Sequence, residues 1–403
     1  MPSDWDDVPL QSCAERIVRG ASPRPIEDPK WFDNRSSVGW LRISDATSSG
    51  RFLTETQQRL STAGIRHSRP VSAGGLVMSI CATVGRPIET SIDVCIHDGF
   101  VHFDKPSIDQ GFLYYVLTDL EPRWSKRGQT GSQMNLNTGL IKATKVAVPR
   151  DSSEQSSIAT ALGDVDALLA AQDALIAKKR AIKQGAMQEL LTGKRRLPGF
   201  SGEWEVRRLG SLGQSYGGLV GKTKNDFGQG DAQYVTFVNV MANIVVDVNA
   251  FDKVNISPGE LQNRVLKNDL LFNGSSETPE EVAMCALVVD EVKNLYLNSF
   301  CFGFRLNDGA GIDSLFLTYY MRGQIGRDLI KSLAQGSTRY NLSKPAFLDG
   351  ELILPSADEQ VAIANVLSDM GAEIAALEAK RAKTAQLKQG MMQTLLTGRL
   401  RLV

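Results

Sequence analysis

A block of 44 residues occurs twice in this chain, and this duplication constrains the fold more than any other feature. Residues 154–197 and 359–402 are identical at 23 of 44 aligned positions, with a constant offset of 205. The sequence Leu-Leu-Thr-Gly, for example, ends at Gly193 in the first copy and at Gly398 in the second. Because a fixed-period repeat marks a repeated architecture, we expect two copies of one structural unit.

The two halves also share short motifs outside this block, separated by long stretches that are unlike each other. Trp5 recurs as Trp204, and Gly131 recurs as Gly336. The organisation along the 403 residues is therefore variable, fixed, variable, fixed. The expected divisions are residues 1–150, 151–203, 204–355 and 356–403.

Each copy of the fixed block is predicted to form one long helix. Ala, Leu, Lys, Gln and Glu dominate residues 154–191, and all of them favour helices. Gly193 and Gly398 stand where a helix-terminating glycine in the left-handed conformation belongs. At 1.5 Å per residue, about 38 residues would span roughly 57 Å.

Apolar residues recur along both predicted helices at the three-, four- and seven-residue steps of a coiled-coil seam. They are Ile158, Leu162, Val165, Leu169 and Ile176 in the first copy, and Ile363, Leu367, Met370, Ile374 and Leu377 in the second. Either each helix packs on its own neighbouring domain, or the two helices pack on each other. We favour an antiparallel coiled coil that acts as a spacer between two globular domains, because two equivalent stripes in one chain are natural partners. Gly185 and Gly390, inside the helices, either mark the close approach of another helix or are inherited without a role.

The variable segments combine helix and strand patterns, so the chain as a whole is predicted to be an α+β protein with two mixed α/β domains. Strands are expected where β-branched and aromatic residues gather or where a short apolar run occurs. The predicted strands cover residues 39–45, 76–80, 232–240 and 269–273, and the predicted helices cover residues 112–117 and 315–320.

Each of these two helices is followed by a basic stretch rich in Gly, Ser and Gln, at residues 123–133 and 331–341. Arg, Gln and Asn can present two hydrogen-bonding atoms to a base edge, whereas Lys suits phosphates. The candidate DNA contacts are Lys126, Arg127, Gln133 and Asn135 in the first domain, and Lys222, Lys224, Thr338, Arg339, Tyr340 and Asn341 in the second. The alternative interpretation is an ordinary solvated loop, in which Asn135 and Asn341 cap the turn into the next strand.

No catalytic or metal-binding motif stands out in the sequence. Residues 217–223 fall one residue short of a phosphate-binding loop, and no hydrophobic strand precedes them. Five cysteines without a CxxC pair and only three histidines argue against a zinc site, a disulfide framework or a histidine-based hydrolase. With 45 basic and 45 acidic residues, the net charge neither requires nor excludes a nucleic-acid partner. Neither a membrane-spanning run nor an apolar leader is evident, so we expect a cytoplasmic protein.

The fixed block resembles the conserved helical regions of specificity subunits from type I restriction–modification systems. The features that carry the resemblance are Glu154-Gln155 through Gly193, the copy from Glu359-Gln360 through Gly398, the preceding Pro149 and Pro355, and the starts at Trp5 and Trp204. The resemblance implies that residues 1–150 and 204–355 are target recognition domains, each reading one half of a bipartite double-stranded DNA site. It further implies that the two antiparallel helices, packed as a coiled coil, set the gap between the halves and dock modification subunits. The whole would be a pseudo-twofold internal repeat.

The resemblance also implies that this subunit is not an enzyme and holds neither cofactor nor metal. S-adenosylmethionine for adenine methylation, and ATP with Mg²⁺ for translocation and cleavage, would belong to the modification and restriction subunits of a system that defends against phage. A competing interpretation is a duplicated, non-catalytic scaffold that binds no DNA. The divergence of the two variable domains favours a DNA reader, since a scaffold gains nothing from unlike domains on like helices.

Overall fold

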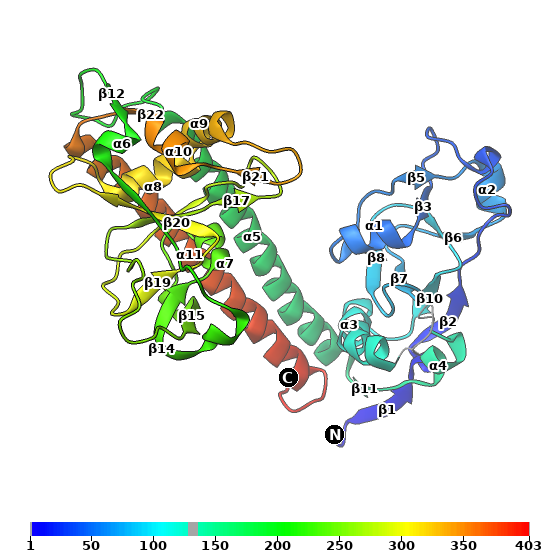
Figure 1. The fold of residues 1–403 in the computed structure, drawn as a ribbon. Coiled ribbons are helices and arrows are strands. Elements are labelled where there is room, and N and C mark those ends of the chain that lie inside the picture. Colours follow the sequence, from blue (N-terminus) through cyan, green and yellow to red (C-terminus); the bar gives the residue numbers. More distant parts are fainter. Residues whose placement is uncertain (1, 128–135, 403) are drawn as a thin grey trace. The chain divides into compact units, whose positions relative to one another are not determined.

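The computed structural model describes residues 2–127 and 136–402, which form two compact units (Figure 1). The first unit consists of residues 1–173 together with 379–403, and the second consists of residues 174–378. Each unit thus combines one variable domain with one end of each long helix. No helix within the described residues is both long enough and apolar enough to span a membrane.

The first unit is built on two small sheets and a strand pair. A five-stranded sheet has the order β2 (Ala14–Arg19), β10 (Phe100–Pro106), β7 (Leu76–Ser79), β8 (Pro87–Thr90), β4 (Phe52–Leu53). A four-stranded sheet has the order β5 (Gln58–Arg59), β3 (Gly39–Leu41), β9 (Val94–Ile96), β6 (Arg69–Val71). The strand pair joins β1 (Trp5–Pro9) to β11 (Lys145–Pro149), and the short helices are α1 (Ile43–Ser48), α2 (Thr62–Arg66) and α4 (Thr138–Ala143).

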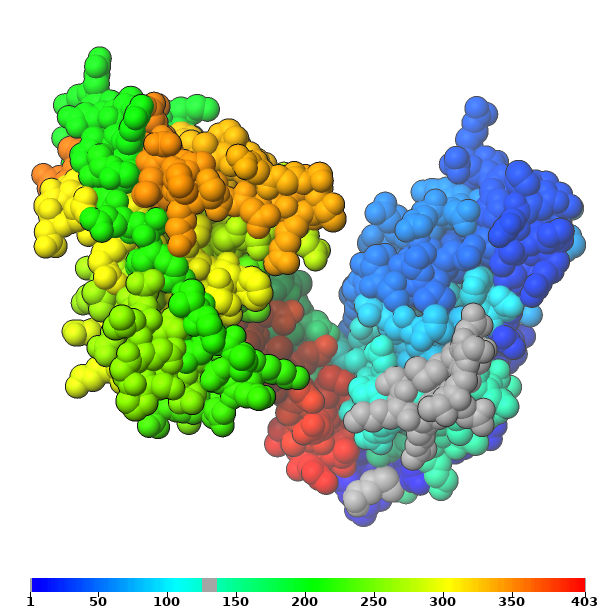
Figure 2. All heavy atoms as spheres, in the orientation of Figure 1, coloured from blue at the N-terminus to red at the C-terminus, as the bar shows by residue number. Residues whose placement is uncertain are grey.

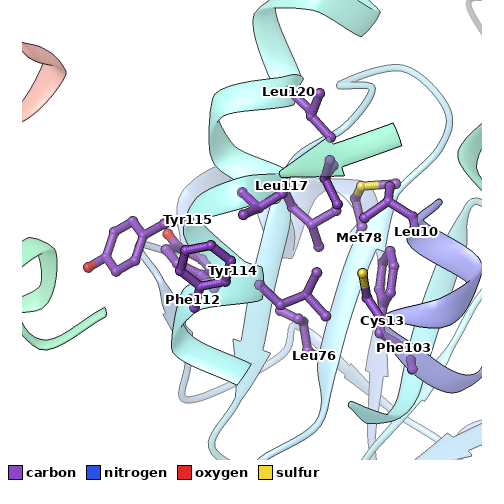
Figure 3. Packing of buried hydrophobic residues seen from close by; sticks show 14 of the residues in the cluster. Leu10, Cys13, Leu76, Met78, Phe103, Phe112, Tyr114, Tyr115, Leu117 and Leu120 are labelled. Carbon is purple, nitrogen blue, oxygen red and sulfur yellow. The ribbon is translucent and has the colours of Figure 1, made fainter. Parts of the chain in front are cut away.

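The core of the first unit lies between the five-stranded sheet and helix α3 (Gln110–Arg127). Figure 3 shows Leu117 of α3 close to Leu76 and Met78 of the sheet. All three side chains are fully buried. In the same view Tyr115 directs its hydroxyl away from this cluster, which leaves that group free to contact another element.

The second unit repeats this topology although its sequence is unlike that of the first. Its larger sheet has the order β13 (Gly213–Gly217), β20 (Cys301–Leu306), β16 (Leu270–Asn273), β18 (Cys285–Leu287). The smaller sheet has the order β15 (Phe251–Val254), β14 (Phe227–Val235), β19 (Leu295–Leu297), and the strand pairs are β12 (Glu205–Arg208) with β22 (Glu351–Leu354) and β17 (Ser275–Ser276) with β21 (Tyr340–Asn341). The helices are α6 (Leu209–Leu212), α7 (Phe237–Ala242), α8 (Ser314–Arg322), α9 (Gln324–Leu333) and α10 (Lys344–Asp349). In chain order, β13, β16, β18 and β20 correspond to β2, β7, β8 and β10, and each smaller sheet contains one parallel pair, β3 with β9 and β14 with β19.

Two predicted strands end earlier than expected, for the same reason in both units. The strand predicted over residues 39–45 ends at Leu41, and the one predicted over 232–240 ends at Val235. In each case a side chain caps a short helix that follows at once: Asp45 accepts a hydrogen bond from the backbone N–H of Arg42, and Thr236 accepts one from Asn239. Capping at a helix N-terminus therefore overrides the β-propensity of the residues that follow.

The two long helices pack together in antiparallel fashion, which confirms the predicted arrangement. Helix α5 covers Ser152–Leu190 and α11 covers Ala357–Leu395, 39 residues each. In the first unit Lys388 pairs with Asp166 at 2.6 Å and Arg381 pairs with Asp173 at 2.9 Å, so the numbering falls along one helix as it rises along the other. In the second unit Lys179 pairs with Glu373 at 2.6 Å.

The seam residues near the helix starts also enter the domain cores, so both interpretations of the apolar stripe hold in part. Ile158 and Leu162 are fully buried in the core that α3 shares. Ile363 and Leu367 occupy the equivalent place in the second unit. Each domain is thereby fixed to its own end of the helix pair by apolar packing.

Candidate nucleic-acid interface and docking helix

The junction between domain and helix is built from the same residues in both units. Gln155, which is buried, accepts a hydrogen bond from the backbone N–H of Asp109 at 2.8 Å and donates to the carbonyl of Pro149 at 2.8 Å. Gln360 accepts from the N–H of Asp313 at 3.0 Å and donates to the carbonyl of Pro355 at 2.9 Å. The duplicated glutamine thus connects the start of the long helix to the start of the domain helix.

Asp109 and Asp313 are themselves helix caps. Asp109 accepts from the N–H of Phe112 at 2.8 Å in α3, and Asp313 accepts from the N–H of Phe316 at 2.7 Å in α8. Both bonds satisfy amide donors that a helix N-terminus leaves free. The orientation of each domain on its helix end is therefore fixed by directional bonds as well as by apolar packing.

The C-terminal end of each fixed block forms an ion pair with the start of the other fixed block. In the first unit Arg401 donates to both carboxylate oxygens of Glu154 and also pairs with Asp4. In the second unit Arg196 donates to both oxygens of Glu359. Because Arg401 is the repeat of Arg196 and Glu154 the repeat of Glu359, each ion pair joins one copy of the fixed block to the other.

A second reciprocal contact lies further along the helices, and here the two units differ. Lys388 lies over the ring of Tyr115 at 5.4 Å and pairs with Asp166, which also accepts from the Tyr115 hydroxyl at 2.7 Å. Lys183 lies over the ring of Tyr319 at 5.4 Å, but the residue equivalent to Asp166 is Gly371. Burial lowers the pKa of Lys183 from its ordinary value, and no carboxylate among the described residues forms an ion pair with it.

The structure does not support a close helix approach at the duplicated glycines. A Cβ atom built on Gly185 or on Gly390 would meet nothing within 4 Å. Both positions are open among the described residues of this chain.

Most of the predicted contact residues of the second domain lie on an exposed turn. Residues 335–341 form a small loop closed by two backbone hydrogen bonds between Gln335 and Asn341, of 2.9 and 2.8 Å. Thr338 and Arg339 are exposed, and Tyr340 is half-buried. The side chain of Asn341 donates to the carbonyl of Arg339 at 3.3 Å, which is the turn-capping role that the alternative interpretation gave it.

The two predicted lysine contacts differ in their surroundings. The amine of Lys222 donates to Glu260 at 2.6 Å and to the carbonyl of Asn255 at 2.7 Å, and its side chain is only 7% exposed. Lys224 is exposed and has no ion-pair partner within the described part of the chain. Lys222 therefore holds a loop together, and Lys224 alone is available to a phosphate.

The candidates of the first domain are only partly described. Lys126 and Arg127 belong to the last turn of α3, and Gln133 and Asn135 lie outside the described residues. The leucine that follows the polar stretch is nevertheless hydrogen-bonded to an equivalent backbone position in both units. Leu136 donates to the carbonyl of Ile80 at 2.8 Å, and Leu342 donates to the carbonyl of Gly274 at 3.2 Å.

These contacts identify a loop in each domain that was not predicted from the sequence. In the first domain it connects β7 to β8, and in the second it connects β16 to β18. Ser79 and Asn273 end β7 and β16 and are fully buried. Each accepts a backbone hydrogen bond from its own loop, Ser79 from the N–H of Arg86 at 3.1 Å and Asn273 from that of Met284 at 2.5 Å. In both domains a buried polar side chain organises the loop beside which the polar stretch is anchored. In the second domain the sequence does show an Asn that ends an apolar run and is followed by Gly-Ser-Ser, a pattern typical of a loop.

A second apolar stripe runs along α5 on a side that no described residue of this chain covers. Leu168, Leu175 and Ile182 follow seven-residue steps and are 48%, 41% and 47% exposed. Ala171 between them is also exposed. The equivalent positions on α11 are Glu373, Lys380 and Leu387, so only α5 carries the continuous stripe. Seven-residue spacing suits a partner helix.

The described residues, 2–127 and 136–402, contain no group of three His, Cys, Asp or Glu side chains placed to hold a metal ion. The five cysteines are free, and burial raises the pKa of Cys13 and Cys95 to about 11. Thiols with so high a pKa are poor nucleophiles at neutral pH.

Comparison with known proteins bears on these features. Residues 201–389 match the family model described as type I restriction modification DNA specificity domain. The fold of the whole chain is similar to that of a type I restriction–modification S subunit from M. genitalium, with a TM-score of 0.58 and 11% identity over 97% of this chain and 96% of that one. It is also similar to a structure from work on assembly and conformational transition of the type I system, with a TM-score of 0.61 and 14% identity over 99% of both chains.

The matched region contains the second domain and most of α11, and the internal repeat supplies the same helix and the same domain topology in the first half. The similar structures extend the shared fold over nearly the full length of the chain. Residues 201–389 therefore match the DNA specificity domain of type I restriction–modification systems, and the chain as a whole shares the fold of an S subunit from such a system.

Proposed function

We propose that each domain recognises one half of a bipartite DNA target and that α5 and α11 set the gap between the halves. The observation that carries this proposal is the combination of one domain topology, used twice, with unlike loops at equivalent places. A repeated frame fixes where the loops stand, and divergent loops allow each copy to read a different sequence.

In the second domain the turn at residues 335–341 is the proposed reading surface. Arg339 is exposed, and a guanidinium can donate two hydrogen bonds to a guanine edge in the major groove. Thr338 beside it can contact either partner of a base pair. Lys224 is the proposed phosphate contact, whose role is position rather than sequence readout.

The exposed stripe on α5 is the proposed docking surface for a modification subunit. Three large apolar side chains, at 41–48% exposure, leave a face that a partner helix would bury. The modification subunit would bring S-adenosylmethionine, and restriction subunits would bring ATP and Mg²⁺. This chain would contribute recognition and geometry without a cofactor of its own.

The reading model is tested by exchanging one domain. The subunit is assembled with its modification partners, its methylated target is identified by selection from random DNA, and residues 1–150 are then replaced by the matching domain of another member of the family. We expect one half of the target to change while the other half and the gap persist. A change in both halves, or no selected target, would refute independent reading and favour the scaffold interpretation.

The docking model is tested by placing a charge on the stripe. Leu175→Glu should weaken the binding of the modification subunit by at least tenfold, because a carboxylate would be buried without a partner. Ala170→Glu, on an exposed position two residues from Leu168 and outside the stripe, is the matched control and should bind normally. Equal binding by both variants would exclude the stripe as the docking surface.

A further inference from the structure

We propose that the hairpin loop at residues 274–284 is a second reading element of the second domain, and that Glu277 is its base-contacting residue. The inference rests on the proposed DNA-reading function and assigns a specificity-determining residue to it. The expected ligand chemistry is an amino group on a base edge, such as N4 of cytosine in the major groove.

The loop is held from its base by Asn273. The buried amide of Asn273 donates to the carbonyls of Ser275 and Glu281, both at 3.0 Å, while its oxygen accepts from the N–H of Met284. One side chain therefore forms hydrogen bonds to both arms of the loop. A loop tied in this way presents its tip in one conformation, which base recognition needs.

Arg327 of α9 holds the loop from the other side. Its guanidinium donates to the carbonyls of Val282 and Ala283, the latter at 3.1 Å, and only 9% of the residue is exposed. Ala283 has a φ of +51°, a left-handed conformation that is uncommon for alanine. The bonds from Arg327 and Asn273 flank this residue and keep the turn in place.

The loop lies beside the proposed reading turn. Ser275 and Ser276 form β17, which pairs antiparallel with Tyr340 and Asn341 of β21 (Figure 1). The side chain of Arg339 donates to the Ser275 hydroxyl at 3.3 Å. Figure 2 shows the two segments adjoining on the surface, the turn in orange and the loop in yellow-green. One surface therefore offers a donor, Arg339, next to a set of acceptors.

Among the three carboxylates of the loop, Glu277 is the one left available. Glu281 accepts from the Ser276 hydroxyl at 3.1 Å, and Glu280 pairs with Lys331 at 3.3 Å. Glu277 is exposed, and no described residue forms an ion pair or hydrogen bond with its side chain. A free carboxylate close to a polyanion is unfavourable unless it meets a hydrogen-bond donor, and base amino groups are the donors that duplex DNA presents in its grooves.

The first domain has the same construction with a shorter loop. Ser79 takes the place of Asn273, and Gly85, with a φ of +88°, takes the place of Ala283. The N–H of Gly85 donates to the Ser79 carbonyl at 2.8 Å, as that of Ala283 donates to the Asn273 carbonyl at 3.0 Å. The hydrogen bonds at the base of the loop are common to both domains, whereas the residues at its tip differ. This is expected of an element that varies with the DNA target.

The test compares Glu277→Gln with Glu280→Gln in the complete complex with modification subunits. The two variants make the same charge change in the same loop, and thermal unfolding confirms that both are folded. Binding is measured against the selected target and against single-base variants of it. We expect Glu277→Gln to lose discrimination at one base pair, by roughly 5- to 100-fold, while Glu280→Gln keeps the wild-type profile.

Two results would overturn the assignment while leaving the proposed function intact. One is an unchanged base profile for Glu277→Gln, and the other is tighter binding to every sequence alike, which would mean that the carboxylate faces a phosphate. A wild-type complex that selects no bipartite target would instead overturn the proposed function, and this assignment with it.

Discussion

Arg401 donates to both carboxylate oxygens of Glu154, and Glu154 is only 1% exposed. The indole N–H of Trp5 donates to the same carboxylate at 3.3 Å. The two ends of the sequence therefore complete one buried site at the start of α5. The equivalent ion pair in the second unit joins Arg196 to Glu359.

Removing Arg401 should destabilise the first unit strongly. Arg401→Met leaves the buried carboxylate of Glu154 without its cation, and an unpaired buried charge is strongly destabilising. Denaturant unfolding monitored by Trp fluorescence would measure the loss. Arg150→Met is the matched control, since Arg150 forms an exposed pair with Asp6, and we expect a much smaller change in stability there. Equal effects of the two substitutions would show that burial of Glu154 does not govern this junction.

Lys224 and Lys222 should affect DNA binding differently. Lys224→Ala should weaken binding to all sequences and reduce the slope of log affinity against log salt by about 0.9, the change for one phosphate contact. Lys222→Ala should leave the slope unchanged, because its amine is bound to Glu260 and Asn255. Binding titrations from low to moderate salt decide between them. A smaller slope for Lys222→Ala would place that amine on the DNA.

Glu260 should make stability depend on pH in an acidic window. Its bonds with Lys222 and Gln262 hold the pKa of the Glu260 carboxyl at about 2 in the folded protein, below the ordinary value of 4.5. A lowered folded pKa contributes stability that is present above the unfolded pKa and is lost as pH falls towards the folded one. Between pH 5 and pH 2 the wild type should therefore lose more stability than Glu260→Gln. Thermal midpoints of the two proteins across this range provide the measurement, and parallel curves would contradict the prediction.

Matched insertions in the two helices should change the gap in the target and nothing else. Seven residues added after Asp173 in α5 and seven after Glu378 in α11 preserve the seam and lengthen the pair by about 10 Å. At about 3.4 Å per base pair, this length corresponds to roughly three additional base pairs between the half-sites. Selection of the methylated target would show a longer gap between unchanged halves. Altered half-sites with the original gap would rule out a spacer role.

The sequence was sufficient for the long helices because their apolar spacing reports packing directly. Ile158, Leu162 and their copies Ile363 and Leu367 follow the expected steps and are buried. The helix pair itself follows from the presence of two such stripes. The domain junctions were harder to predict from the sequence. The role of Gln155 depends on the backbone N–H of Asp109, which lies 46 residues away.

The candidate site was harder to predict because its parts are assembled by tertiary contacts. A polar stretch at 331–341 is visible in the sequence, but its neighbour at 274–284 is brought to it by the pairing of β17 with β21. Lys222 looked available to DNA because its partner, Glu260, is 38 residues away. Local composition reports which side chains are polar, and it does not report which of them are already bonded.

The closure of the first unit by Arg401 also fixes an order of events during protein synthesis. Glu154 leaves the ribosome 247 residues before Arg401, a delay of roughly 12–50 s at bacterial and eukaryotic elongation rates. The second unit lies within one continuous segment, residues 174–378, and all of it is synthesised before Arg401 appears. The half of the molecule that is translated first is therefore the last to be completed, and until then α5 lacks the end of α11 that packs on it.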